Sequence, residues 1–102
     1  MHIDQYTYEA MKTRLPTANK EYALLGLAGE VGELYSLVAK SIRDQKQIDL
    51  KLLKAEVADC VWFLSAISVD YGFSLSEALE ENLAKLQKRK KAGTLTGSGD
   101  NR

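Results

Sequence analysis

Two acidic doublets, each set inside a strongly apolar run, constrain the fold of this chain more than any other feature. Glu30 and Glu33 form the first doublet, and Glu56 and Asp59 form the second. Residues three apart on a helix are neighbours on one face, so each doublet points two negative charges in one direction. An unpaired charge is costly in apolar surroundings. We therefore expect a positive partner between the doublets, and a hard divalent cation with oxygen ligands fits best.

Apolar residues recur at i, i+3 and i+4 spacing along most of the chain, which predicts an all-α domain without strands. We expect helices over about residues 5–15, 20–43, 50–71 and 75–91. Asp4 and Asp49 are expected N-caps, and residues 74–77 have the pattern of a capping box. Pro16 is expected to end the first helix, and Gly72 is the expected C-cap of the third.

The two long helices are expected to share one layout, with a core-facing apolar stripe on one side and an acidic doublet on another. The stripe of the first long helix comprises Leu24, Leu27, Ala28, Val31, Leu34, Tyr35, Val38 and Ile42. The stripe of the second comprises Leu53, Val57, Cys60, Val61, Leu64, Ile67 and Tyr71. Packed antiparallel through a short loop, the two helices would bring all four carboxylates to one place.

Three glycines, Gly26, Gly29 and Gly32, lie in the first long helix beside its acidic doublet. Each glycine in a helix interior costs about 1 kcal/mol relative to alanine. Such a cluster indicates that something approaches the backbone closely. Tight helix–helix packing and room for a ligand are both consistent with it.

Ligation by oxygen atoms alone, with water in the remaining positions, suits magnesium, or manganese in its place. Magnesium keeps part of its water shell and commonly recruits a phosphate-bearing substrate, so a polyphosphate is the expected partner. A carboxylate not used as a ligand could accept a proton from metal-bound water. Asn82, Lys85 and Arg89 follow one edge of the last helix and offer donors to a phosphate or a base. Solubility of the helix end is the other interpretation of these three residues.

Composition excludes several classes. The formal net charge is zero, so no global field attracts nucleic acid or an anionic membrane. No apolar run reaches the roughly 20 residues of a membrane span, and the first residues lack a signal-peptide pattern, so we expect a cytoplasmic protein. The single histidine, His2, cannot supply a di-iron bundle or the base of a serine hydrolase. The single cysteine, Cys60, excludes an internal disulfide and a thiolate zinc site and is expected to be buried.

The segments 29–34 (GEVGEL) and 56–64 (EVADCVWFL) resemble the MazG-like nucleotide pyrophosphohydrolases of the all-α NTP pyrophosphatase superfamily, which are marked by Glu-x-x-Glu followed by Glu-x-x-Asp. Three further regions are similar to the family: the first helix after residues 5–6, the segment 82–89, and the ending 97–102. The likeness therefore covers nearly the whole chain as a single domain, 1–102. The acidic motif alone is moderately specific, and these features in order are strongly so.

The resemblance implies hydrolysis of a nucleoside triphosphate between its α and β phosphates, giving the monophosphate and pyrophosphate, in nucleotide-pool housekeeping. Mg²⁺ would be held at the catalytic residues Glu30, Glu33, Glu56 and Asp59. The implied substrate-binding residues are Asn82, Lys85, Arg89 and Lys40. The Gly/Ser-rich tail, 92–102, is otherwise expected to be flexible and becomes a candidate lid over the phosphates. Family members form dimers or tetramers, which implies a helical bundle completed by oligomerisation.

Two alternatives remain open at this point. The first is a relative that acts on another pyrophosphate-linked nucleotide, such as phosphoribosyl-ATP or an alarmone. The second is a non-catalytic helical module whose acidic faces bind a basic partner. Trp62 and Phe63 are interpreted as core or interface residues in preference to a platform for base stacking. The nucleobase, the number of metal ions and the general base are not assigned by the sequence.

Overall fold

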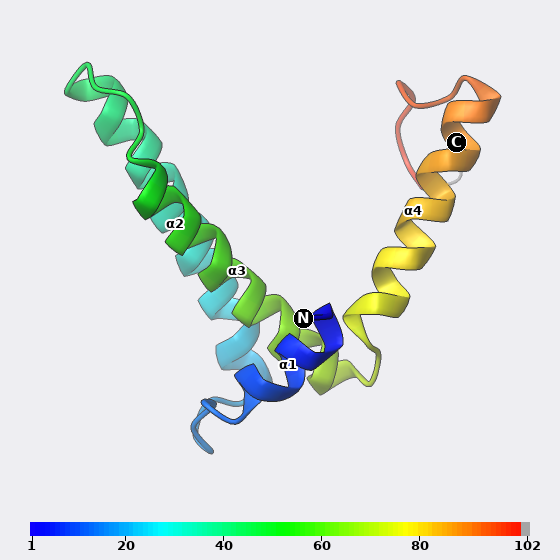
Figure 1. The fold of residues 1–102 in the computed structure, drawn as a ribbon, viewed down its shortest axis with the longest axis horizontal. Coiled ribbons are helices and arrows are strands. Elements are labelled where there is room, and N and C mark those ends of the chain that lie inside the picture. The colour runs from blue at the N-terminus through cyan, green and yellow to red at the C-terminus, as the bar shows by residue number, and fades with distance from the viewer. Residues whose placement is uncertain (101–102) are drawn as a thin grey trace.

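The computed structural model describes residues 1–100 as four helices, and no strand occurs among them. The helices are α1 (Ile3–Met11), α2 (Lys20–Arg43), α3 (Leu50–Tyr71) and α4 (Leu75–Ala92). Helices α2 and α3 form a long antiparallel hairpin, α1 crosses its base, and α4 leaves the base as a separate arm (Figure 1). This arrangement confirms the all-α prediction with two long antiparallel helices. None of the described helices is long and apolar enough to cross a membrane.

Local capping signals explain why the long helices begin and end where the sequence predicts. The side chain of Asn19 accepts a hydrogen bond from the backbone N–H of Tyr22 at 2.9 Å. Asp49 caps α3 in the same way, accepting from the N–H of Lys51 at 2.9 Å. Gly72 ends α3 with φ at 77°, in the left-handed region that glycine adopts without strain.

The first helix differs from the prediction at both ends. It begins at Ile3, and Asp4 is not its N-cap. The Asp4 carboxylate instead accepts hydrogen bonds from the backbone N–H of Ser76, at 3.1 Å, and from the Ser76 hydroxyl. Asp4 therefore joins the start of the chain to the first turn of α4, where a negative charge complements the helix dipole. The helix ends at Met11, before the predicted Leu15.

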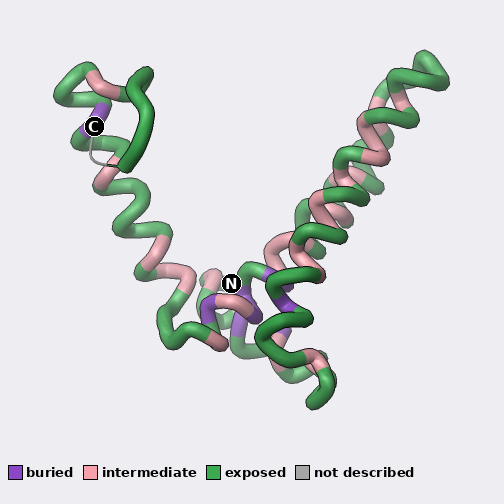
Figure 2. Tube along the Cα trace, turned by 180° about the vertical axis from the view of Figure 1, so that it is seen from behind, coloured by how far each residue is buried: buried purple, intermediate pink, exposed green. Residues whose placement is uncertain are grey.

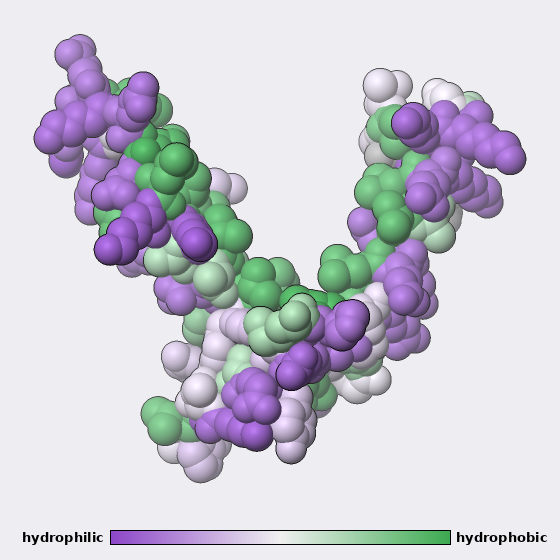
Figure 3. Space-filling model, viewed as in Figure 1, coloured by the Kyte–Doolittle hydropathy of each residue, from purple (hydrophilic) through white to green (hydrophobic). Residues whose placement is uncertain are grey.

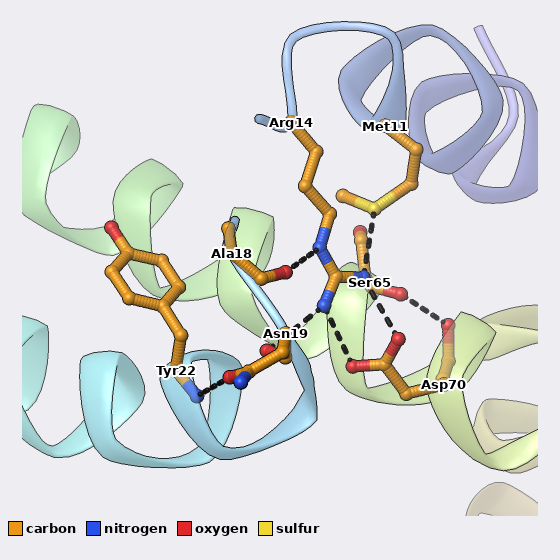
Figure 4. Close-up of polar contacts among 8 residues, drawn as sticks. Met11, Arg14, Ala18, Asn19, Tyr22, Ser65 and Asp70 are labelled. Atoms are coloured by element: carbon orange, nitrogen blue, oxygen red, sulfur yellow. Dashed lines mark hydrogen bonds and ion pairs between the residues drawn. The ribbon is translucent and has the colours of Figure 1, made fainter. Parts of the chain in front are cut away.

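The Arg14 side chain, just beyond the end of α1, bonds to α3 and to the loop before α2 (Figure 4). The guanidinium forms a two-pronged ion pair with Asp70, in which both N–O distances are 2.9 Å. It also donates to the backbone carbonyls of Ala18, at 2.8 Å, and Asn19, at 3.2 Å. The arginine lowers the pKa of the Asp70 carboxyl through this hydrogen bonding. The loop before α2 is thereby fixed on α3.

The core is small and lies where α1 crosses the hairpin (Figure 2). Its buried apolar residues are Ala10, Ala23, Phe63 and Ala66, and its buried polar residues are Thr7, Ser65 and Ser68. The predicted apolar stripes are only partly covered within one chain. Tyr35 and Ile42 of α2 are 69% and 72% exposed. The prediction that these stripes face a core therefore holds only in part for a single chain, since Leu27, Val31 and Leu34 are half-buried. The buried Ala23 lies outside the predicted stripe.

Candidate metal centre and substrate pocket

Three of the four predicted carboxylates meet between α2 and α3. Glu30 of α2 and Glu56 and Asp59 of α3 each offer an oxygen atom, and these atoms all lie within 4.8 Å of one another. Glu30 and Glu56 are half-buried, whereas Asp59 is exposed. The cluster is therefore rooted in the hairpin and open on one side. Oxygen ligands with one open side suit a hard cation that keeps water and binds a substrate.

Burial and repulsion between like charges dominate the electrostatics of the cluster. Burial raises the pKa of Glu30, and the negative charges of Asp59 and Glu56 raise it further. The Oε2 atom of Glu56 is buried and has no hydrogen-bond partner among the described residues. A buried carboxylate oxygen without a partner is costly, and a divalent cation would relieve both the repulsion and the missing contact. Glu30, Glu56 and Asp59 thus fit a cation as its ligands.

Glu33 and Lys40 stand apart from the cluster. Glu33 is exposed and does not belong to the three carboxylates that converge, although its charge contributes to the raised pKa of Glu30. Lys40 is exposed ten residues further along α2 than Glu30, about 15 Å at the rise of an α-helix. Their assignments, metal ligand for Glu33 and substrate contact for Lys40, stay predictions.

The three glycines of α2 play two different parts. A Cβ atom on Gly26 would lie 2.2 Å from Cε1 of Phe63, so the absence of a side chain lets the aromatic ring pack on the helix. Nothing lies within 4 Å of the corresponding position at Gly29 or Gly32. Tight packing therefore accounts for Gly26, whereas the other two leave the helix surface beside the acidic doublet open.

An aromatic cavity of about 290 Å³ adjoins the carboxylates, and it is lined by Tyr22, Glu30, Asp59, Trp62 and Phe63. The ring of Phe63 is buried and contacts Trp62 edge-on, with 5.0 Å between centroids. The Tyr22 ring lies 5.8 Å from that of Phe63. Phe63 is thus a core residue, as predicted, while Trp62 is only half-buried and forms a wall of the cavity.

Tyr22 is a candidate site residue that the sequence reasoning missed. The signal was available, because Tyr22, Gly26 and Glu30 follow one another at intervals of four along α2. On the opposite wall, the Trp62 indole N–H donates to the hydroxyl of Thr13 at 3.0 Å. That partner lies in the turn after α1, which no helical periodicity relates to α3.

Cys60 also lies near the cluster. It is half-buried, less covered than predicted. Burial raises the pKa of its thiol, and the charges of Glu30, Glu56 and Asp59 act in the same direction. The thiol is therefore held in its protonated form, which is a poor nucleophile.

The α4 residues predicted to bind substrate do not reach the carboxylates within one chain. Helix α4 contacts α1 and α3 but not α2, and it points away from the hairpin (Figure 1). Asn82 is exposed, whereas Lys85 and Arg89 contact Asp100 of the chain's own tail. Up to Asp100 the tail folds back on α4 through these contacts, and its flexibility stays a prediction. Residues 101 and 102 of the predicted tail lie outside the described residues.

Comparison with known proteins gives two matches. The family model for the MazG nucleotide pyrophosphohydrolase domain matches residues 18–94, which include the whole hairpin and α4. The Gene 37 protein of Mycobacterium phage L5 is 36% identical over 114 aligned residues, and the alignment covers 100% of both chains. No solved structure matches the chain.

Proposed function

This chain belongs to the MazG nucleotide pyrophosphohydrolase family, and we propose that it hydrolyses nucleoside triphosphates to monophosphates and pyrophosphate with Mg²⁺. The observation that carries the proposal is the group of Glu30, Glu56 and Asp59, with its buried and unpartnered Glu56 oxygen. Such a site binds a hard cation, and a hard cation with open positions binds polyphosphate.

The carboxylates would have different roles in the proposed reaction. Bound Mg²⁺ would neutralise phosphate charge and lower the pKa of a coordinated water. Glu30 and Glu56 are half-buried in the hairpin, so their carboxylates would contact the ion from the protein side. Asp59 is exposed and would face the side from which the substrate binds. A carboxylate that is not fully used as a ligand can take the proton of the attacking water. Glu33, exposed next to the cluster, is available for this role or as a further ligand.

The aromatic cavity supports a nucleoside as the rest of the substrate. Its walls carry Tyr22 and Trp62 directly beside two of the carboxylates. Stacking of a base on an aromatic ring is worth about 1–3 kcal/mol and tolerates any base. The hydrogen bond from Trp62 to Thr13 fixes the orientation of the indole before a ligand arrives. A base held here would leave its phosphates within reach of the cation.

Assembly into a homodimer or homotetramer is part of the proposal. The chain exposes 7886 Å², about 2,000 Å² more than a folded monomer of its mass. Its radius of gyration is 16.6 Å, against about 13 Å for a compact domain of this length. Figure 3 shows apolar surface on the sides of the hairpin and of α4 that face each other. Leu79 and Leu83 of α4 are each 55% exposed.

The excess of exposed surface is of the size that a stable protein interface buries, so a second copy packed against these surfaces would account for it. Assembly would also be the means of carrying Asn82, Lys85 and Arg89 to a carboxylate cluster, because α4 does not contact α2 within one chain.

The test is pyrophosphate release from a mixture of nucleoside and deoxynucleoside triphosphates, measured with Mg²⁺, with EDTA and with the Glu56→Gln protein. We expect release only from the unmodified protein with Mg²⁺, and a loss of at least about a hundredfold in the variant. Glu80→Gln, which removes the same charge from an exposed position on α4, is the matched control and should stay active.

Other outcomes are equally decisive. Cleavage of a different pyrophosphate-linked nucleotide, with the same dependence on Mg²⁺ and Glu56, would keep the site and change the substrate. If Mg²⁺ altered neither activity nor melting temperature, a non-catalytic interaction module would replace the enzyme.

A further inference from the structure

Two cations on one face of α4 converge on a single oxygen atom. The ammonium of Lys85 lies 3.0 Å from Oδ1 of Asp100, and Nη2 of Arg89 lies 3.3 Å from the same atom. The two side chains are four residues apart and therefore neighbours on the helix. Together they lower the pKa of the Asp100 carboxyl, with the hydrogen bond from Lys85 as the largest cause. Lys85 and Arg89 thus form an anion-binding site, which we call the anion seat. The Asp100 carboxylate of the same chain occupies it.

The arginine and the aspartate of this ion-pair cluster differ in how far they are exposed. The Arg89 side chain is only 6% exposed, and its buried Nε has no hydrogen-bond partner among the described residues. Its Nη2 also donates to the backbone carbonyls of Asp100, at 2.8 Å, and Gly99, at 3.4 Å. The Asp100 side chain, in contrast, is 80% exposed. Among the described residues, the polar contacts that hold the guanidinium therefore come from the tail, while the Asp100 side chain itself lies at the surface.

The tail reaches the seat through two left-handed glycines. Gly93 ends α4 with φ at 72°, and Gly99 has φ at 82° directly before Asp100. A side chain is strained in this region of backbone conformation, so both turns depend on glycine. The return of the chain onto α4 is thus specified by the backbone as well as by the ion pairs.

We propose that Asp100 occupies the seat of a substrate phosphate, so that the tail competes with substrate and is displaced when substrate binds. This inference rests on the proposed function, because Lys85 and Arg89 are the residues expected to contact the triphosphate. A carboxylate paired at an exposed position is held weakly. A phosphate group carries more charge and more acceptor oxygens, and arginine matches its geometry in two-pronged contacts. Phosphate therefore outcompetes the carboxylate, and Asp100 sets how much substrate is needed.

The experiment measures binding without catalysis. Inorganic pyrophosphate is titrated into the full-length protein in EDTA, by calorimetry, for the unmodified chain and for Asp100→Asn. We expect the variant to bind at least about two- to fivefold more tightly, which is the factor for one exposed ion pair, because the substitution removes the pairs of Asp100 with both Lys85 and Arg89. Glu80→Gln is the matched control, because it removes the same charge from α4 at an exposed position away from Lys85 and Arg89, and it should bind as the unmodified chain does.

A second variant leaves every charge in place. Gly99→Ala strains the left-handed turn without a steric clash against the described residues, since none of their atoms lies within 4 Å of the added atom. It should loosen the tail and tighten pyrophosphate binding in the same direction as Asp100→Asn. The gain in both variants should disappear when Arg89→Met is added, because the seat itself is then lost.

The proposal is overturned if Asp100→Asn binds pyrophosphate equally or more weakly, which would make the tail a structural support of the site. It is also overturned if binding survives Arg89→Met or if no form binds pyrophosphate. None of these readouts involves hydrolysis. A protein that cleaves no triphosphate would refute the proposed function and leave the competition at Lys85 and Arg89 to be decided by the titration.

Discussion

The α2–α3 hairpin and the α4 arm differ in whether their clustered charged side chains are paired with opposite charges. The hairpin gathers Glu30, Glu56 and Asp59, and among the described residues a buried oxygen of Glu56 has no hydrogen-bond partner. The arm gathers Lys85 and Arg89, and the tail already neutralises them through Asp100. Under the proposed function, the acidic half of the site would need a metal ion from solution, whereas the basic half would have to release a part of its own chain.

The two regions also differ in how firmly the chain holds them. The base of the hairpin is fixed by the ion pair between Arg14 and Asp70, whose side chains are 14% and 12% exposed. The arm is tied at its start by Asp4, which bonds to Ser76, and otherwise extends from the base. One chain thus preorganises the carboxylates, and in the proposed assembly a second copy would bring the cations to them.

The largest effect is expected from breaking the base of the hairpin. Asp70→Asn would leave the mostly buried Arg14 guanidinium without its counter-charge, which costs about 2–4 kcal/mol at such sites. Thermal unfolding should show this loss at neutral pH. Asp44→Asn is the matched control, since Asp44 pairs with Arg43 on the surface, where both side chains are 45% exposed or more, and it should change the melting temperature little.

The same variant predicts a pH dependence. Because Arg14 lowers the pKa of Asp70 below its ordinary 3.8, the ionised carboxylate stabilises the fold above that value, and the contribution disappears as the pH falls through the lowered pKa. The difference in melting temperature between the unmodified protein and Asp70→Asn should be constant above about pH 5 and shrink in more acidic solution. A difference that grows on acidification would contradict the assignment.

A smaller loss is expected where the hairpin helices meet. Gly26→Ala would place a methyl group 2.2 Å from the Phe63 ring, and overpacking of this kind costs about 1–3 kcal/mol. Gly29→Ala adds the same group where nothing lies within 4 Å, so it should stabilise the helix by up to about 1 kcal/mol. Opposite shifts in melting temperature would confirm the two roles. Combining Gly26→Ala with Phe63→Leu should recover part of the loss.

The smallest expected change in stability tests the repulsion among the three carboxylates. In EDTA, Glu30→Gln should raise the melting temperature by a few degrees, because it removes like-charge repulsion worth about 1 kcal/mol or less per pair. In Mg²⁺ the order should reverse, because only the unmodified cluster gains stability from the ion. Glu80→Gln on the arm should show no such reversal. An equal response of Glu30→Gln and the unmodified protein to Mg²⁺ would contradict a cation at the cluster.

Much of the fold follows from the sequence. Asn19, Asp49 and Gly72 set the ends of the long helices through hydrogen bonds that span no more than five residues. The acidic doublets mark the elements that carry the site. Prediction was weaker at α1, where Asp4 had the pattern of a local cap but bonds to Ser76, 72 residues away. An N-cap residue and an acceptor for a distant helix look alike in sequence.

The sequence by itself determined the four helices, the caps Asp49 and Gly72 of α3 and the presence of two acidic doublets, because these depend on periodicity and on contacts within a turn or two. The tertiary structure alone decided that Glu30 converges with Glu56 and Asp59 while Glu33 stays outside, since the crossing of two helices selects which residues of a face meet. It also decided that the tail returns to α4. The physical reason is the sequence separation of the contacts. Periodicity within one helix determines which residues share a face, whereas the position of a partner from another element depends on packing across the whole chain.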